Sequence, residues 1–242
     1  MTPEQRTTHI TGLIEHAITH QPRSLQRTIG PSEIGNPCDH CLTARLAGWV
    51  KHETETPWLT VIGTAMHSWL ENQFNQYEAA NLDDTQHWIT EGRVCVGSID
   101  GQAIWGSTDL VDVDGRMTVD WKIVGDSSLQ RYKAGPSETY RVQAHLYARG
   151  WNRRGIPIDT VSICFLPRNK QMRHAYWWHE PYQPKIAEDA LARAERLAVT
   201  ARLLAEDSIE RRDAWISRLA RAPNCWDCRK YTDMQLTLNQ VL

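Results

Sequence analysis

The most informative segment of the chain is Gly106-Ser-Thr-Asp109-Leu-Val-Asp-Val-Asp114-Gly115-Arg-Met-Thr-Val-Asp120-Trp-Lys122. Its apolar residues alternate on both sides of Asp114-Gly115, a pattern that predicts two antiparallel strands joined by a two-residue type I′ turn. The turn fixes the register, so paired positions sum to 229 and Asp109 is expected directly opposite Asp120. Their Cβ atoms would then lie ~5 Å apart. Lys122 is expected on the same face.

Opposed carboxylates repel each other across a strand pair, so this arrangement needs a compensating cation. Oxygen ligands suit a hard ion such as Mg²⁺ or Mn²⁺, which can activate a water molecule and neutralise charge on a phosphoryl oxygen. Lys122 could orient or deprotonate that water, or stabilise a transition state. The alternative is a solvated hairpin face of mixed charge. We adopt that interpretation for Asp112, because the same register places it on the opposite face.

Hydrophobic periodicity predicts the elements on either side of this hairpin. Helices are expected at residues 4–20, 59–80 and 137–149, and from Pro184 to about Ala220. A further, irregular helix is expected to begin at a cap, Ser32, and to continue past Pro37 towards Trp49. Strands are expected at 93–99, 103–113, 117–124, 161–166 and 174–179. This order predicts the α/β (α+β) fold class, with helices layered on a sheet.

Four short motifs occur in order around the hairpin: Gly63-Thr-Ala-Met-His67-Ser-Trp-Leu-Glu71, Gly106-x-x-Asp109, Asp120-x-Lys122 and Gln143-Ala-His-Leu-Tyr147. The first places Gly63, His67 and Glu71 about one helical turn apart, and the last puts Gln143 and Tyr147 on one helix face. Together they resemble the GxxxHxxxE, GxxD, DxK and QxxxY motifs of the PD-(D/E)XK nuclease superfamily. Within it, the chain is most similar to the RecB-like exonuclease group, which includes CRISPR-associated and AddB-type iron–sulfur exonucleases.

The resemblance implies a restriction-endonuclease-like core with a central mixed β-sheet flanked by helices. It implies a divalent metal bound by His67, Asp109, Asp120 and the Trp121 carbonyl. It also implies phosphodiester hydrolysis with Lys122 catalytic, and with Gln143 and Tyr147 lining the site. Taken singly, His67 could be structural or solvated, Glu71 a surface residue or one that orients His67, and Tyr147 a core residue. His145, His16 and His20 match no motif and are expected to be solvated.

Six cysteines are present, and four of them form the pairs Cys38-Asp-His-Cys41 and Cys225-Trp-Asp-Cys228. Two Cys-x-x-Cys pairs predict a four-thiolate site for zinc or an iron–sulfur cluster, which would join the early and terminal helices. Unrelated thiols or a redox pair are the alternatives. The resemblance favours a [4Fe–4S] cluster, although the related exonucleases distribute their cysteines one plus three rather than two plus two. Cys95 and Cys164 are expected to be buried hydrophobes.

Composition is that of a globular protein, with 242 residues, 41% hydrophobic and 23% charged residues, and a net charge of −2. Between Lys122 and Arg173, ten basic residues face three acidic ones, a distribution that suits a polyanion bound by one surface. Charges from several surfaces could give the same local excess. The candidates for phosphate contact are Arg131, Lys133, Arg141, Arg168, Lys170 and Arg173.

The sequence therefore predicts a metal-dependent DNA exonuclease of recombination, repair or DNA-end processing, located in the cytoplasm of a bacterial or phage-infected cell. Alternatives are an endonuclease or nickase of the same fold, and a non-catalytic DNA-end or protein-docking module. We expect one nuclease domain over 1–242, with a catalytic core at 59–180 and a helical cap at 30–50 and 184–230. DNA is the expected partner. No membrane or small-molecule substrate is expected; an oligomer is allowed, but nothing in the sequence shows one.

Overall fold

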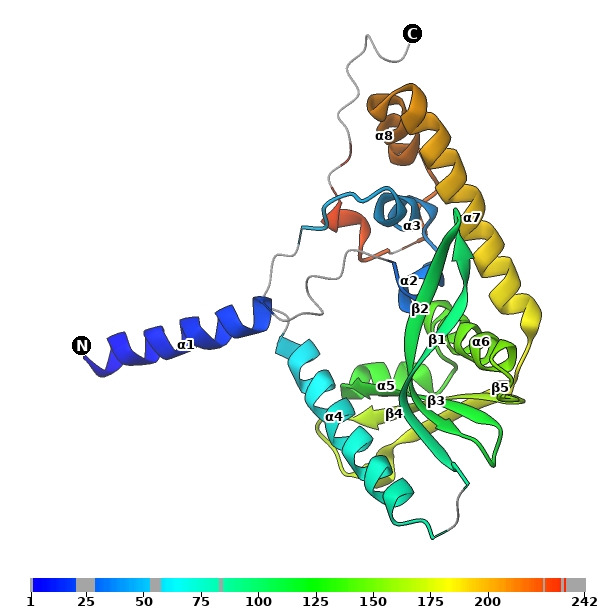
Figure 1. The fold of residues 1–242 in the computed structure, drawn as a ribbon. Coiled ribbons are helices and arrows are strands. Elements are labelled where there is room, and N and C mark those ends of the chain that lie inside the picture. The colour runs from blue at the N-terminus through cyan, green and yellow to red at the C-terminus, as the bar shows by residue number, and fades with distance from the viewer. Residues whose placement is uncertain are drawn as a thin grey trace.

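A computed structural model describes residues 2–20, 29–52, 58–82, 85–223, 225–231 and 233. It contains a mixed five-stranded sheet flanked by helices, as predicted (Figure 1). In chain order the elements are α1 (Pro3–Thr19), α2 (Pro31–Ile34), α3 (Asp39–Leu46), α4 (Trp58–Ala79), β1 (Trp88–Ile99), β2 (Gln102–Asp112), β3 (Met117–Val124), α5 (Asp126–Tyr132), α6 (Glu138–Arg153), β4 (Thr160–Pro167), η2 (Met172–His174), β5 (Tyr176–Pro181), α7 (Pro184–Asp207), α8 (Ile209–Ser217) and η3 (Cys228–Lys230).

The sheet has the order β1-β2-β3-β4-β5. Strands β1, β2 and β3 form an antiparallel meander, β3 and β4 are parallel, and β4 and β5 are antiparallel. Parallel neighbours need a crossover connection, and here the crossover carries α5 and α6. The strands occur where the alternating pattern predicts them, except that β1 begins at Trp88, five residues before the predicted start.

The register of the β2–β3 hairpin is the predicted one, because Leu110 pairs with Val119 and Asp112 with Met117, positions that sum to 229. The predicted turn type is wrong. A type I′ turn needs positive φ at both central residues, whereas only Arg116 in this loop has one, at 51°. The loop instead spans four residues, 113–116, and the Asp112 carboxylate accepts the Gly115 N–H at 2.8 Å. This side-chain contact stabilises the wider loop without shifting the register.

Strand β3 separates two hydrophobic layers, because its side chains alternate in direction. Val119 and Trp121 face α4, where the Phe74 ring stacks on Trp121 with centroids 6.0 Å apart. On the other face, α6 packs into the main core, and its Trp151 indole donates to the Thr108 hydroxyl at 2.9 Å. The opposite directions of Trp121 and Asp120 therefore follow the predicted strand parity.

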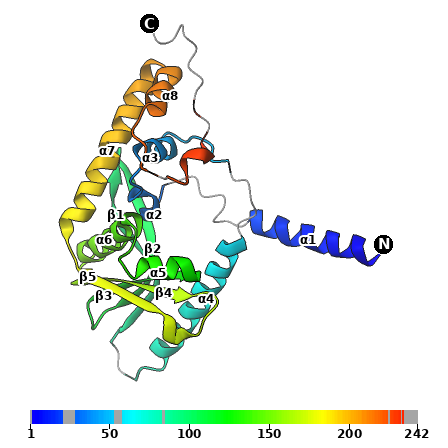
Figure 2. The same ribbon diagram turned by 180° about the vertical axis from the view of Figure 1, so that it is seen from behind.

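Helices α3, α7 and α8 pack together at one end of the sheet (Figures 1 and 2). A second, smaller core lies there between α3, α8 and the segment around η3. The predicted single helix from Pro184 to Ala220 is wrong, since α7 ends at Asp207 and α8 begins at Ile209. The break lies at Ser208, which has an extended backbone. Its hydroxyl oxygen caps α8 by accepting the Arg211 N–H.

The early helical region also differs from the prediction. Ser32 is not a cap: the N-cap is Gly30, Pro31 occupies the first helical position, and the Glu33 carboxylate accepts the Gly30 N–H at 3.0 Å. Two short helices, α2 and α3, replace one ragged helix, because Pro37 lies between them and disfavours helical backbone in the residue before it. Helices α1 and α4 lie within a residue of their predicted bounds. No helix in the described ranges is long and apolar enough to cross a membrane.

His145 was expected to be solvated, and this prediction is wrong. Its side chain is fully buried on α6, where Nδ1 accepts the Gln183 N–H and Nε2 lies 2.6 Å from the Glu180 carboxylate. The ring is therefore neutral with its proton on Nε2. Burial lowers the pKa of His145, and it outweighs the opposing effect of Glu180.

The buried His145 predicts a pH dependence of stability. Its folded-state pKa lies below the unfolded value of ~6.5, so the stabilisation is complete above that pH and is lost as the pH falls below it. The Glu180 pKa is also lowered, because Arg141 and His145 outweigh burial, so its contribution is lost only as the pH falls below ~4.3. We expect His145→Gln to flatten the decline in unfolding free energy as the pH falls below about 6.5.

Urea unfolding at several pH values measures this effect. His179→Gln is the matched control, because His179 is an exposed histidine on β5, and it should leave the pH profile unchanged. A His145→Gln profile parallel to that of the unsubstituted protein would contradict the assignment.

Candidate active site and four-cysteine site

A cleft of about 1130 Å³ brings together most of the predicted site residues. Strands β1 to β3 and helices α4, α6 and α7 all contribute to its walls. The predicted residues that line it are His67, Glu71, Asp109, Asp120, Lys122, Gln143 and Tyr147. The Trp121 side chain is buried against α4, so this residue reaches the site through its backbone N–H and carbonyl groups.

A buried ion pair lies at the base of the cleft. The Lys122 ammonium is 2.5 Å from Asp120 Oδ2, and both side chains are largely removed from solvent. Gln143 on α6 joins them, because its amide nitrogen donates to Asp120 Oδ1 at 3.2 Å and its amide oxygen accepts from Lys122 at 3.3 Å. The same nitrogen contacts the Tyr147 hydroxyl at 3.2 Å. The Gln143–Tyr147 helix face thus fixes the two charged groups of β3.

The electrostatics of this pair follow from burial and proximity. Burial raises the pKa of Asp120 to about 6, with the Lys122 charge opposing the rise and the Asp109 charge adding to it. Burial alone would lower the pKa of Lys122, but Asp120 and Asp109 outweigh it and raise that pKa. The Tyr140 ring, 4.6 Å from the Lys122 nitrogen, adds a cation–π contact. Lys122 is therefore held as a cation.

His67 projects from α4 towards the ends of β2 and β3. Its Nε2 lies 3.0 Å from the Trp121 carbonyl oxygen, and its Nδ1 lies 3.3 Å from Asp109 Oδ1. Burial would lower the pKa of His67, but the hydrogen bond and charge of Asp109 outweigh it and raise the pKa. The GxxxHxxxE helix therefore brings its histidine to the hairpin carboxylate, while Glu71 lines the cleft wall.

Asp109 and Asp120 do not form the predicted backbone pair. The β2–β3 ladder ends at Leu110 and Val119, one residue before them. Asp109 Oδ2 instead accepts the Trp121 N–H at 2.7 Å, so the carboxylate occupies the place of the next ladder bond. The strands separate here and leave room between the two carboxylates. Asp112 does not line the cleft and bonds within the turn, in keeping with its predicted face.

Glu91 is a site residue that the sequence did not reveal. It lies on β1 between Thr90 and Gly92, which pair with Leu110 and Thr108, and is therefore next to Asp109. Its φ of 45° is left-handed, an uncommon conformation for a residue with a side chain. One ligand atom from each of His67, Glu91 and Asp109 lies within 4.8 Å of the others. The predicted strand began at Arg93, so Glu91 was missed; the adjacent Gly92 was the available signal.

This donor set fits a divalent cation. Its carboxylate and backbone carbonyl oxygens suit Mg²⁺ or Mn²⁺, and His67 adds one imidazole nitrogen. His67 Nε2 and the Trp121 oxygen are 3.0 Å apart, and adjacent ligands of an octahedral ion with bonds of ~2.1 Å have about this separation. Asp120 is bonded to Lys122 and Gln143 and lies outside the His67–Glu91–Asp109 cluster. The fit is thus closest for His67, Asp109 and Glu91.

None of the six basic residues predicted to contact phosphate lines the cleft. Two of them are held in ion pairs elsewhere, Arg141 with Glu180 and Lys170 with Asp126. The arginines that line it are Arg45, Arg93, Arg202 and Arg212. Trp105 also lines the cleft with 47% of its side chain exposed, and the Arg93 guanidinium lies 5.2 Å from the centre of its ring.

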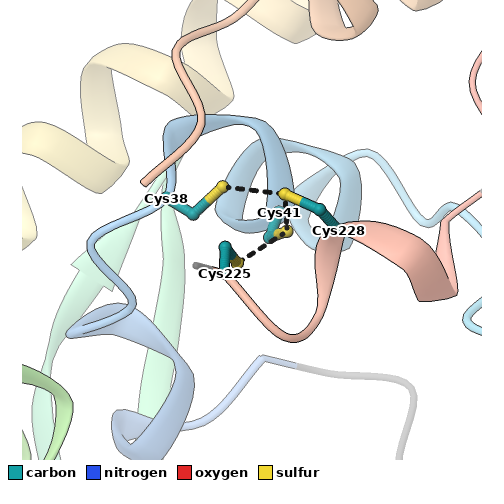
Figure 3. Close-up of side chains that lie close together, drawn as sticks. All are labelled: Cys38, Cys41, Cys225 and Cys228. Atoms are coloured by element: carbon teal, nitrogen blue, oxygen red, sulfur yellow. Dashed lines mark hydrogen bonds between the residues drawn. The ribbon is translucent and has the colours of Figure 1, made fainter. Parts of the chain in front are cut away.

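The two Cys-x-x-Cys pairs meet at a second site, away from this cleft (Figure 3). Cys38 and Cys41 come from the start of α3, and Cys225 and Cys228 come from the segment that leads into η3. The Sγ atoms of Cys38 and Cys228 are 3.5 Å apart, those of Cys41 and Cys228 3.5 Å, and those of Cys41 and Cys225 3.6 Å. The predicted four-cysteine cluster is confirmed. Cys164 is buried as predicted, whereas Cys95 is half-buried.

No family model matches the chain, and no curated protein matches it. Solved structures to which it is similar include several exonucleases. A putative exonuclease from Eubacterium rectale has 12% identity and a TM-score of 0.47, over 91% of this chain and 94% of that one. An alkaline exonuclease from Laribacter hongkongensis has 12% identity and a TM-score of 0.39, over 53% of this chain. The match spans 62% of the Laribacter enzyme, less than two thirds of its length.

A phage-related exonuclease from Haemophilus somnus 129PT is also similar. It has 11% identity and a TM-score of 0.35, over 59% of this chain and 74% of that one.

The position of Glu91 predicts an effect on metal affinity. Glu91→Gln removes one negative oxygen from the cluster with His67 and Asp109, so we expect the Kd for Mn²⁺ to rise roughly tenfold or more. Titration calorimetry in the absence of nucleic acid measures this Kd. The matched control is Glu71→Gln, because Glu71 lines the same cleft but lies outside the cluster. Equal effects of the two substitutions would show that Glu91 is no ligand.

Proposed function

We propose that this cleft is the catalytic centre of a divalent-metal-dependent DNA exonuclease that hydrolyses phosphodiester bonds. The observation that carries the proposal is the buried Lys122–Asp120 pair directly beside the His67–Glu91–Asp109 cluster in one open cleft. A cation, a metal-ligand set and room for a polymer are the parts that phosphodiester hydrolysis requires.

The metal would be held by His67, Asp109 and Glu91, with Asp120 and the Trp121 carbonyl completing the set. When bound, Mg²⁺ or Mn²⁺ supplies a Lewis acid for a phosphoryl oxygen and lowers the pKa of a coordinated water. The chain's own residues prepare that site: the Trp121 N–H fixes Asp109, and the Trp121 carbonyl fixes the His67 ring. Both contacts come from the backbone of β3, so the ligands depend on a rigid strand rather than on a loop.

Lys122 serves best as a fixed positive charge. Its raised pKa means that it keeps its proton at neutral pH, so it is suited to stabilise the charge that develops on the phosphate rather than to remove a proton from water. Asp120, Gln143 and the Tyr140 ring hold the ammonium in place. A preorganised charge of this kind is most effective where water is excluded, and the burial of Lys122 meets that condition.

The same pair argues for catalysis over a purely binding role. Bringing two charges out of water costs several kcal/mol per ion before their attraction and hydrogen bonds offset it. Well-packed apolar residues could fill the space between β3 and α6 without this desolvation cost. A docking module would have no use for a buried ammonium aimed into a cleft, whereas a phosphodiesterase does.

Nucleic acid would follow the wall that carries Arg93 and Trp105. Within the described ranges Arg93 makes no ion pair with a carboxylate, so its charge is available to a phosphate. The exposed Trp105 indole can stack on an unpaired base, as aromatic residues do in single-strand channels. Trp105 and Asp109 are four residues apart on β2, about 13 Å along a strand. The stacked base would therefore lie close to the metal ligands.

We also propose the partner, the pathway and the location in which the protein acts. DNA is the partner, the pathway is recombination, repair or DNA-end processing, and the location is the cytoplasm of a bacterial or phage-infected cell. The nuclease domain would extend over residues 1–242. Its catalytic core would occupy 59–180, and the cap would consist of 30–50 and 184–230.

Incubation of the protein with end-labelled linear DNA and with closed circular DNA, plus Mn²⁺ or EDTA, tests the proposed activity. We expect metal-dependent loss of linear DNA alone; cleavage of circles would instead indicate an endonuclease. Asp120→Ala and Lys122→Ala should each reduce kcat by at least ~10²-fold while circular dichroism shows a retained fold. Lys185→Ala is the control, since Lys185 is 81% exposed in a surface pair with Asp189. Full activity of either cleft variant would refute the site.

Substitutions of Trp105 and Arg93 test the proposed nucleic-acid path. Trp105→Ala should weaken binding of single-stranded DNA by ~1–3 kcal/mol, the usual contribution of one stacked base, with little change in kcat. Arg93→Ala should reduce the slope of log K against log salt by about 1. Fluorescence anisotropy with labelled oligonucleotides measures both, and Trp69→Ala, an exposed tryptophan outside the cleft, is the control. Unchanged affinity in both cleft variants would rule out this path.

A further inference from the structure

The spacing of the four cysteine sulfurs distinguishes between the two kinds of metal centre that the sequence allows. All four Sγ atoms lie within 4.8 Å of one another, and three of the separations are 3.5, 3.5 and 3.6 Å. The side chains come from two segments and converge on one point (Figure 3). The pair at the start of α3 is buried, and the C-terminal pair is partly buried.

A single tetrahedral ion requires this spacing. Zinc–sulfur bonds of ~2.3 Å at tetrahedral angles place any two sulfurs ~3.8 Å apart. In a [4Fe–4S] cluster each cysteine binds a different iron, so an iron–iron separation and two iron–sulfur bonds lie between any two cysteine sulfurs. Such a cluster would not fit among sulfurs that all lie within 4.8 Å of one another. The iron–sulfur centre implied by the resemblance therefore disagrees with this geometry.

We propose that Cys38, Cys41, Cys225 and Cys228 bind one zinc ion. The four thiolates fill the tetrahedral shell and leave no position for water or substrate, which is the mark of a structural zinc site rather than a catalytic one. The proposal is independent of the nuclease activity proposed for the cleft.

The surroundings of the cysteines suit the net negative charge of a zinc ion with four thiolates. The Arg221 guanidinium contacts the Cys228 side chain and also pairs with Asp233. Asp233 in turn lies 2.7 Å from His40 Nε2, so His40 is held by this carboxylate and does not belong to the ligand group. Such second-layer contacts orient ligands and balance charge at metal sites.

The ion would join two segments that are distant in sequence. Its ligands fix α3 to the segment at residues 225–231, and Ile216 and Tyr231 pack beside them in the small core of the cap. Helix α3 also carries Arg45, which lines the cleft. Zinc would therefore hold one wall of the cleft in place without touching the reacting groups.

Metal analysis tests the proposal directly. The full chain, freed of any affinity tag, is produced in medium that contains both iron and zinc and is purified without oxygen. We expect about one zinc per chain and no stoichiometric iron or sulfide. About four irons with four sulfides per chain would overturn the proposal. So would a protein that contains no metal and takes up neither Zn²⁺ nor Co²⁺ when titrated.

Cobalt substitution identifies the ligands. Co²⁺ added to the metal-free chain should give the visible absorption of a tetrahedral thiolate site, and Zn²⁺ should abolish it. Cys228→Ser should lose this spectrum and the bound zinc, whereas Cys95→Ser, a cysteine outside the cluster, should keep both. Retention of zinc and of the spectrum by Cys228→Ser would exclude the assigned ligand set. The metal content of the unsubstituted chain decides the question even if Cys228→Ser does not fold.

Discussion

The buried contact between Lys122 and Asp120 determines how the helices on both faces of β3 must be arranged around the site. Two charges removed from water need close partners, and the partners here are Gln143 and the Tyr140 ring on α6. Helix α6 can reach them only because the parallel crossover from β3 to β4 places it across β3. On the other side of the same strand, α4 packs on Trp121 and thereby brings His67 to the end of the hairpin. The site is thus a consequence of how both faces of one strand are covered.

Much of this arrangement could be predicted from the sequence, because it depends on periodicity. Strand parity placed Asp120 and Lys122 opposite Trp121, helical spacing placed Gln143 with Tyr147, and the Cys-x-x-Cys pairs indicated the cluster. The misses have a common physical origin in tertiary contacts. The conformation of Glu91 and the end of the ladder at Leu110 depend on how β1, β2 and β3 separate, which no local pattern encodes. His145 matches no motif, and its burial is tolerable because Glu180 and the Gln183 N–H each bond to one of its ring nitrogens.

The molecule separates the residues proposed to act in catalysis from the cysteines proposed to hold one wall of the cleft in place. Hard oxygen and nitrogen donors meet in the open cleft, where ligands can exchange. Soft sulfur donors meet in the cap, where the coordination shell is closed. With the metals proposed for the two sites, this difference in ligand chemistry would let both bind to one chain without competing. Two of the cleft arginines come from helices of the cap, Arg45 from α3 and Arg202 from α7.

The distance along the chain between the two cysteine pairs has a consequence for the order of biosynthesis. Cys41 and Cys228 are 187 positions apart, so every residue between them must leave the ribosome before the fourth sulfur can reach the other three. The β1–β2–β3 meander joins neighbouring segments and can form while synthesis continues, because contacts close in sequence form fastest. Metal capture in the cap would thus follow the folding of the sheet rather than start it.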